Sequence, residues 1–255
     1  MVSNAFAAKE SLNITSNIMN SYEARKNLIE SIVSKCVEYE LDGINLDFEN
    51  MKAEDKDMYS RFIIELEPRL KEIGMVLSVD VTAPDGGETW SMCFDRHVIG
   101  DVADYIIFMA YDQNGVSSKK PGTTAGYNWI KLNLVKFLQT EEIDPDKLIL
   151  AVPFYTRIWT TNQDGKVVAN PTISMKDVNK NIPNGANKQW NDELKQNYVE
   201  YTSGNNKKEI WIEDLESLKA KISLIKDNNL AGVASWEVDM ASDDAWQMID
   251  KELNK

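Results

Sequence analysis

Short apolar segments alternate with longer amphipathic helices along most of this chain, and that order restricts the fold more than any other feature. Apolar residues spaced three or four apart predict the helices, and the segments between them have the length of buried strands. Strands separated by helices are typical of parallel β/α units, and strands apolar on both faces indicate a sheet covered on both sides. Strands are predicted at 43–48, 75–82, 105–111, 148–154 and 230–236, and helices at 22–39, 53–73, 128–138, 215–227 and 243–253.

Polar side chains gather where the predicted strands end, among them Asp47, Tyr111, Tyr155 and Trp236. In a (β/α)8 barrel the active site is built at these carboxyl ends. An open doubly wound sheet also binds ligands at strand ends, but usually through a glycine-rich phosphate loop, and no such motif is present. We therefore predict an α/β fold of the (β/α)8 TIM-barrel type.

One segment, residues 155–212, departs from the β/α pattern. It is polar and rich in Asn and Lys, with short strand-like pieces at 198–202 and 209–212. We interpret it as a small α+β insertion that precedes the last but one helix. The barrel portion is then expected to consist of residues 1–154 and 213–255.

The charge balance excludes several classes of partner. The chain holds 41 Asp and Glu against 28 Lys and Arg, a net charge of −13. Nucleic acids and anionic membranes call for a basic face, so neither is an expected partner, and no apolar run is long enough to span a membrane. His97 is the only histidine, and Cys36 and Cys93 lack metal-binding spacing. We expect no metal or cofactor, and two free thiols.

The stretch LDGINLDFEN places acidic groups within an apolar run. Alternation along a strand sends Asn45, Asp47 and Glu49 to one face, and Leu46 and Phe48 to the other. The first three residues therefore form a polar row inside the predicted barrel. Asn45 is expected to hydrogen-bond Asp47 without adding a third negative charge.

Two interpretations of this row are open. A buried salt-bridge ladder would need cations inside, and Arg157 is the main candidate. Carboxylates stacked without cations repel each other, which raises the pKa of one of them and suits it to act as a general acid. Glu49 reaches furthest toward the open end, so we assign that role to it. The sequence leaves open whether Asp80, on the next strand, also faces inward near Asp47.

The stretch DGINLDFE resembles the signature of glycoside hydrolase family 18, Asp-x-x-Asp-x-Asp-x-Glu. MAYD at 109–112, VPFYTRIW at 152–159 and the final-strand Trp236 resemble other motifs of the family, in the same order. The resemblance covers essentially the whole chain and is strongest to the bacterial cell-wall and spore-cortex lytic branch, the N-acetylglucosaminidase type. In that branch Asn often stands at the position of Asn45.

The resemblance implies a retaining, substrate-assisted hydrolysis of β-1,4-linked N-acetylglucosamine polymers, either peptidoglycan or chitin. Glu49 would protonate the glycosidic oxygen, Asp47 would orient the substrate acetamide, and Tyr111 would hydrogen-bond its carbonyl. The remaining residues that the resemblance places in contact with the sugar are Asn45, Asp112, Tyr155, Arg157 and Trp236. Of these, Trp236 would provide the apolar surface under the sugar ring.

By the same resemblance, this chain has no counterpart of the first two β/α units of a barrel, because its first four residues, MVSN, are similar to the end of the family's third strand. The hypothesis is a fragment or shortened product that self-associates through an open barrel edge, since unpaired strand edges attract other strands. Family resemblance places the protein outside the membrane, in a wall or spore, although no export signal opens the chain.

A non-catalytic, lectin-like sugar-binding module is the alternative function. An interaction scaffold is a third possible function.

Overall fold

A computed structural model describes residues 1–4, 8–84 and 87–254, which form two compact units. The first unit comprises Met1–Met109 and Val135–Ile149, and the second comprises Ala110–Leu134 and the chain from Leu150 onward. Helix α5 (Tyr127–Gln139) and strand β5 (Leu148–Pro153) contribute residues to both units. These units do not follow the boundaries predicted for the insertion, and the predicted division into barrel and insertion stays a prediction.

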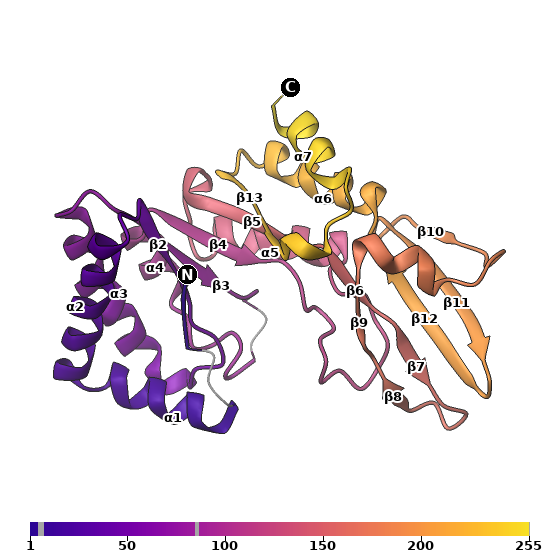
Figure 1. Cartoon of the computed structure of the whole chain (residues 1–255), viewed down its shortest axis with the longest axis horizontal. Helices are drawn as coiled ribbons and strands as arrows, with labels where there is room; N and C mark the ends of the chain where they lie inside the picture. Colours follow the sequence, from indigo (N-terminus) through magenta and orange to yellow (C-terminus); the bar gives the residue numbers. More distant parts are fainter. Residues whose placement is uncertain (5–7, 85–86, 255) are drawn as a thin grey trace. The chain divides into compact units, whose positions relative to one another are not determined.

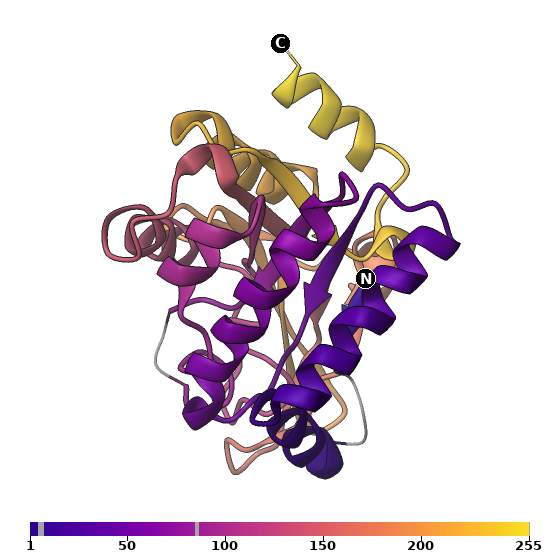
Figure 2. The same ribbon diagram turned by 90° about the vertical axis from the view of Figure 1, so that its left-hand side faces the viewer.

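The first unit is built on parallel strands in the order β1-β2-β3-β4, as the β/α pattern predicts. Its helices α2 and α3 cover one face of these strands (Figures 1 and 2). Its elements are β1 (Val2–Ser3), α1 (Ala8–Met19), α2 (Tyr22–Glu38), β2 (Gly43–Asp47), the 3-10 helix η1 (Ala53–Asp55), α3 (Lys56–Lys71), β3 (Val76–Val81), α4 (Arg96–Val102), β4 (Tyr105–Met109) and η2 (Pro145–Lys147).

Two glycines define how β3 meets β2. Gly74, with φ of 72°, lies just after α3 in the left-handed region that a glycine adopts at little cost. Gly43, at the start of β2, lies so close to β3 that a Cβ atom there would overlap the carbonyl oxygen of Val76. A side chain at position 43 would therefore push the two strands apart and disturb the register that aligns their polar residues.

The second unit combines the last β/α elements with the segment that precedes α6. Strand β5 lies next to β13 (Gly232–Trp236), and the backbone N–H of Phe154 donates to the carbonyl of Trp236 at 2.8 Å. The helical elements that follow β12 (Asn206–Ile212) are α6 (Leu215–Asp227), the 3-10 helix η4 (Val238–Met240) and α7 (Ala245–Leu253). The structure thus contains α6 over the residues predicted for it.

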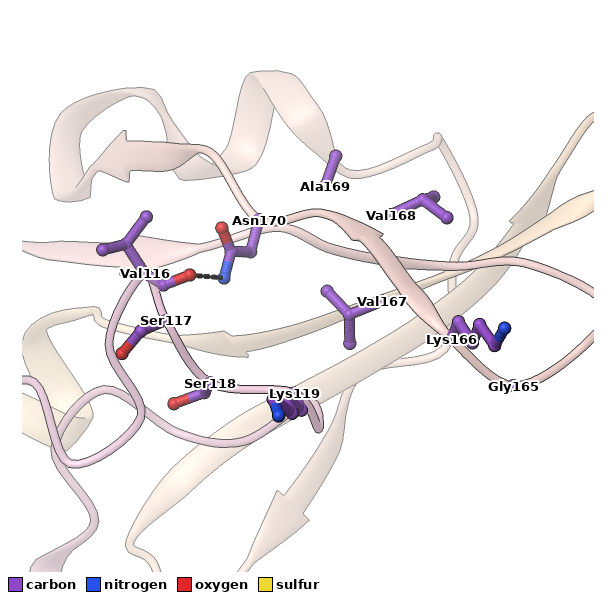
Figure 3. A pocket seen from close by; sticks show the side chains of 10 residues that line it. All are labelled: Val116, Ser117, Ser118, Lys119, Gly165, Lys166, Val167, Val168, Ala169 and Asn170. Carbon is purple, nitrogen blue, oxygen red and sulfur yellow. Dashed lines mark hydrogen bonds between the residues drawn. The ribbon is translucent and has the colours of Figure 1, made fainter.

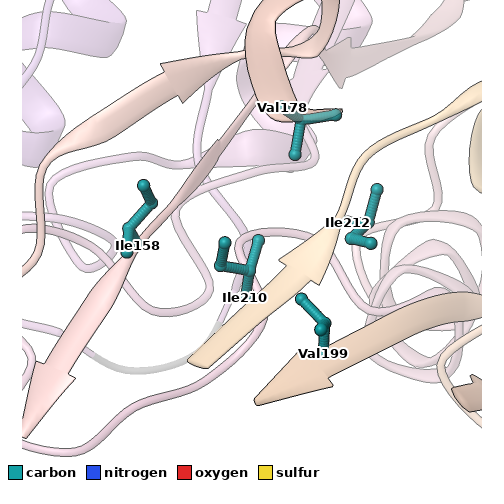
Figure 4. Close-up of a cluster of buried hydrophobic side chains, with 5 residues drawn as sticks. All are labelled: Ile158, Val178, Val199, Ile210 and Ile212. Carbon is teal, nitrogen blue, oxygen red and sulfur yellow. The ribbon is translucent and has the colours of Figure 1, made fainter. Parts of the chain in front are cut away.

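The segment predicted to be an α+β insertion consists mainly of antiparallel strands, and its helical part is a 3-10 helix. One sheet has the order β10-β11-β12-β7-β8, and β6 pairs with β9. Five apolar side chains, Ile158, Val178, Val199, Ile210 and Ile212, form its buried core (Figure 4). The elements are β6 (Tyr155–Arg157), β7 (Trp159–Thr161), β8 (Val167–Ala169), β9 (Thr172–Ser174), η3 (Met175–Asn181), β10 (Gln189–Asn191), β11 (Gln196–Ser203) and β12 (Asn206–Ile212).

Within the described residues no helix is long and apolar enough to cross a membrane. Cys36 and Cys93 are free and buried, as predicted. His97 is exposed on α4, where its Nδ1 lies 3.0 Å from the carbonyl oxygen of Glu141.

Candidate active site

The polar row predicted on β2 has the alternation that the sequence indicates. Leu46 and Phe48 are buried, whereas Asn45, Asp47 and Glu49 are partly exposed on the other face. Burial is the main influence on Asp47 and raises the pKa of its carboxyl above the ordinary value. The arrangement therefore offers a carboxylate and a neighbouring glutamic acid on one face, as an acid-catalysed reaction requires.

Asn45 does not make the hydrogen bond to Asp47 that the sequence suggested. Its Nδ2 donates to Ser78 Oγ at 3.1 Å and to Asp80 Oδ1 at 3.0 Å, both on β3. The reason is the register of the two parallel strands, which pairs Asn45 with Ser78. An amide thus finds closer partners on the adjacent strand than two residues along its own.

Asp80 was not among the predicted site residues, although it lies on the same face as this row. Burial raises the pKa of Asp80 to about 7, and the negative charge of Asp47 adds to the effect. The hydrogen bond donated by Asn45 opposes the rise, because it stabilises the charged carboxylate. Asp80 therefore titrates close to neutral pH.

Glu49 is fixed at its backbone by the side chain of Asn4. Asn4 Oδ1 accepts from the Glu49 N–H at 2.8 Å, and Asn4 Nδ2 donates to the Glu49 carbonyl at 2.9 Å. The same Nδ2 lies 3.1 Å from Thr15 Oγ1 on α1, and Asn4 is buried. Asn50 follows with φ of 51°, so the chain turns immediately after Glu49. Asn4 thus holds the end of β2 in place.

Replacing Asn4 with Ala is expected to lower the free energy of unfolding by about 1–3 kcal/mol, because buried backbone groups lose these bonds. Asn4→Asp keeps the acceptor for the Glu49 N–H but replaces the donor with a buried carboxylate oxygen that faces the Glu49 carbonyl, so its loss should be equal or larger. Urea unfolding measures both. Asn13→Ala, on the exposed side of α1, is the matched control. Equal midpoints for Asn4→Ala and Asn13→Ala would contradict this role.

In the second unit the structure brings together four of the residues predicted for the site. The Tyr155 hydroxyl donates to Asp112 Oδ1 at 2.8 Å, and Arg157 Nη2 lies 3.5 Å from the same oxygen. The rings of Tyr111 and Tyr155 meet edge to face, with centroids 6.2 Å apart. Burial, followed by the charge of Asp112, raises the pKa of Tyr155 well above its usual range. Asp112 itself has φ of 54°, a conformation that Asp tolerates better than most residues.

Arg157 is only 8% exposed and uses part of its hydrogen-bonding capacity within the protein. Its Nη1 donates to the carbonyl of Asn170 at 3.1 Å, while its buried Nε has no partner among the described residues. A buried donor without a partner is costly, so this atom is suited to a hydroxyl of a bound molecule. Trp236, at the end of β13, is 43% exposed and presents an indole to solvent.

The second unit contains a pocket of about 580 Å³, whose lining residues are drawn in Figure 3. Residues 116–119 and 165–170 line it, and none of the predicted site residues is among them. Asn170 connects the two, since its Nδ2 donates to the carbonyl of Val116 at 3.0 Å while its own carbonyl accepts from Arg157. The pocket walls are therefore tied to the position of the arginine.

The motifs and the fold agree with a comparison to known families. The model of glycosyl hydrolases family 18 matches residues 10–241. The chain belongs to this family. An uncharacterized glycosylase of Bacillus subtilis, YvbX, is 27% identical over 242 residues, which cover 93% of this chain and 69% of the relative. The cortical fragment-lytic enzyme of Bacillus subtilis is 24% identical over 243 residues, covering 93% of this chain and 56% of the enzyme.

Similarity to solved structures shows the fold of this chain. A chitinase from Chromobacterium violaceum superimposes with a TM-score of 0.83 at 24% identity, over 92% of this chain and 73% of the chitinase. The likeness shows an α/β fold of the TIM-barrel kind, as the sequence predicted. The chain spans little more than half the length of the cortical fragment-lytic enzyme.

Proposed function

We propose that this family 18 chain is a glycosidase that cleaves β-1,4-linked N-acetylglucosamine-containing polysaccharide with retention of configuration. The observation that carries the proposal is the pair of acids at the end of β2, where Asp47 is the last residue of the strand and Glu49, two residues later, has its backbone held by Asn4. A glycosidic bond needs an acid for its leaving oxygen and an anion near the positive charge that develops.

The reaction we propose is substrate-assisted, as in the family mechanism. Glu49 gives its proton to the glycosidic oxygen while the carbonyl oxygen of the substrate's own 2-acetamido group attacks the anomeric carbon. The C–O bond to the leaving sugar breaks and an oxazolinium ion forms. Asp47 orients the acetamide and stabilises its positive charge. Glu49, now ionised, takes a proton from water, which opens the oxazolinium ion and restores the original configuration.

The residues of the second unit have supporting roles in this proposal. Tyr111 hydrogen-bonds the acetamide carbonyl, and Asp112 and Arg157 bind sugar hydroxyls while holding each other through their ion pair. Tyr155 orients Asp112 through its donated hydrogen bond. Trp236 offers an indole face for the C–H groups of a sugar ring, which is a common mode of carbohydrate contact.

Peptidoglycan and chitin are both proposed substrates, since each contains the acetamide that the mechanism uses. The name of the cortical fragment-lytic relative favours peptidoglycan, and that of the chitinase favours chitin. We propose that the protein acts in a cell wall or spore, again from the lytic relative. A metal or cofactor has no step in this mechanism.

The decisive measurement is the release of reducing ends from chitooligosaccharides, from peptidoglycan and from de-N-acetylated chitooligosaccharides. Turnover of at least one acetylated substrate is expected, and the de-N-acetylated chains should be left uncut because they lack the nucleophile. Equal cleavage of acetylated and de-N-acetylated chains would rule out substrate assistance. Binding of the acetylated glycans without turnover would rule out the enzyme.

A non-catalytic sugar-binding module is the second candidate. Asn45 favours it, because this amide stands where the family signature has its second acid. Binding of the acetylated glycans without release of reducing ends would identify such a module. Self-association through the edge strand β1, or a scaffold role based on it, stays a prediction that solution scattering can test.

A further inference from the structure

Asp80 places a second carboxylate at the level of Asp47. The register pairs Asn45 with Ser78 and Leu46 with Val79, so one more step along both parallel strands brings Asp47 level with Asp80. Neighbouring strands lie about 4.8 Å apart. The burial pattern puts Ser78 and Asp80 on one face of β3, with Leu77, Val79 and Val81 buried on the other.

The surroundings of Asp80 hold it in this position and leave Asp47 as its nearest charged neighbour on β2. Asn45 donates to Asp80 Oδ1 at 3.0 Å, and its bond to Ser78 Oγ at 3.1 Å fixes the amide between the strands. On the other side, the register pairs Asp80 with Ile107 of β4, which is apolar. Besides Asp47, the amino group of Met1 and the buried hydroxyl of Tyr59 on α3 interact electrostatically with Asp80.

Two carboxylates in such a position cannot both be charged without a large repulsion, so one of them retains a proton to higher pH. Burial and the charge of Asp47 both favour the protonated form of Asp80. The amide at position 45 fits this arrangement, because a carboxylate there would bring a third negative charge and could not donate to Asp80.

We propose that Asp80 is a positioning residue that acts through Asp47, by holding the proton that the two carboxylates share and so leaving the negative charge on Asp47. The inference rests on the proposed function of Asp47. When Asp80 also ionises, the two anions repel and Asp47 loses the position in which it would orient the acetamide.

The first test needs no glycan. The folded protein binds the Asp80 proton more tightly than the unfolded chain, so this group stabilises the wild type fully below about pH 4 and loses that effect as the pH rises to about 7. The Asp80→Asn variant has no carboxyl at this position, so its stability does not show this loss as the pH rises. Its urea midpoint relative to wild type should therefore rise steadily between pH 4 and pH 7. Asp57→Asn, on the exposed face of α3, should show a constant difference.

A difference between Asp80→Asn and wild type that does not change with pH would overturn the proposal. If Asp80→Asn does not fold, carboxyl carbon-13 NMR of the wild type decides instead. A midpoint near 7 for the Asp80 signal supports the proposal, and a midpoint near 4 overturns it.

The second test uses the pH profile of kcat on an acetylated glycan. Wild type should lose activity with an apparent pKa near 7, and in Asp80→Asn this alkaline limb should move up by about one pH unit or more. An unchanged limb in an active Asp80→Asn variant would overturn the role of Asp80 while the proposed function stands. If neither protein turns over glycan, the proposed function fails, and the stability measurement still decides whether Asp80 holds the proton.

Discussion

Replacing Glu49 with Gln is expected to lower kcat by about 10²- to 10⁴-fold on any glycan that the wild type cleaves, the usual contribution of a general acid or base. Gln has nearly the same shape as Glu but cannot give a proton to the glycosidic oxygen or take one from water. Binding of the glycan should change much less than kcat, because the sugar contacts are proposed to come from other side chains. Reducing-end release, with binding measured separately by calorimetry, separates the two effects.

Glu54→Gln is the matched control for this experiment. Glu54 is five residues further along and its side chain is 75% exposed, so the same change of acid to amide should leave kcat unaltered. Equal turnover by wild type and Glu49→Gln would end the catalytic assignment. Loss of kcat in both variants would instead indicate damage to the turn after β2.

The sequence predicted most of the local structure because local interactions determine it. Helix α6 is a clear case: Asp214 caps it by accepting from the backbone N–H groups of Glu216 and Ser217, and the structure has the helix over the predicted residues. The face of β2 that carries Asn45 was predictable for the same reason, since alternation along a strand is a local rule.

The contacts that the sequence did not predict depend on register and on distant segments. Asn45 bonds Asp80 rather than Asp47 because β2 and β3 are aligned by their pairing, which no local pattern specifies. Asn4 reaches Glu49 across 45 residues of sequence. A signal for Asp80 was present in the alternation of VLSVDVT, which puts it on the same face as Ser78. That alternation could not say which residue of β2 would lie beside it.

A buried ion pair in the second unit gives the largest expected effect on stability. Lys221 on α6 and Glu213 are each 1% exposed at the side chain, and Lys221 Nζ lies 2.8 Å and 3.0 Å from the two carboxylate oxygens of Glu213. Ser217 Oγ donates to Glu213 at 2.9 Å, and Gln196 donates to it as well. Thr123 in turn donates to Gln196, so the network ties α6 and β11 to the loop after β4.

Lys221→Met is expected to lower the free energy of unfolding by about 3–5 kcal/mol, because Glu213 is left buried without its cation. Lys219→Met on the same helix is the control. Its partner Glu252 lies 3.1 Å away, but the lysine is 61% exposed, so the loss should stay below about 1 kcal/mol. Urea unfolding followed by tryptophan fluorescence measures both variants.

The pH dependence of Lys221→Met separates a lost charge partner from lost packing. Burial already raises the pKa of Glu213 and Lys221 opposes that rise, so removing the lysine should raise it further. A carboxyl with a raised pKa in the folded state stabilises the fold at low pH and loses that effect as the pH rises. The deficit of Lys221→Met should therefore shrink as the pH falls from 7 toward 4. Combining Lys221→Met with Glu213→Gln should recover part of the loss, because no buried charge then remains. A deficit that is independent of pH and is not reduced in the double variant would assign the loss to packing alone.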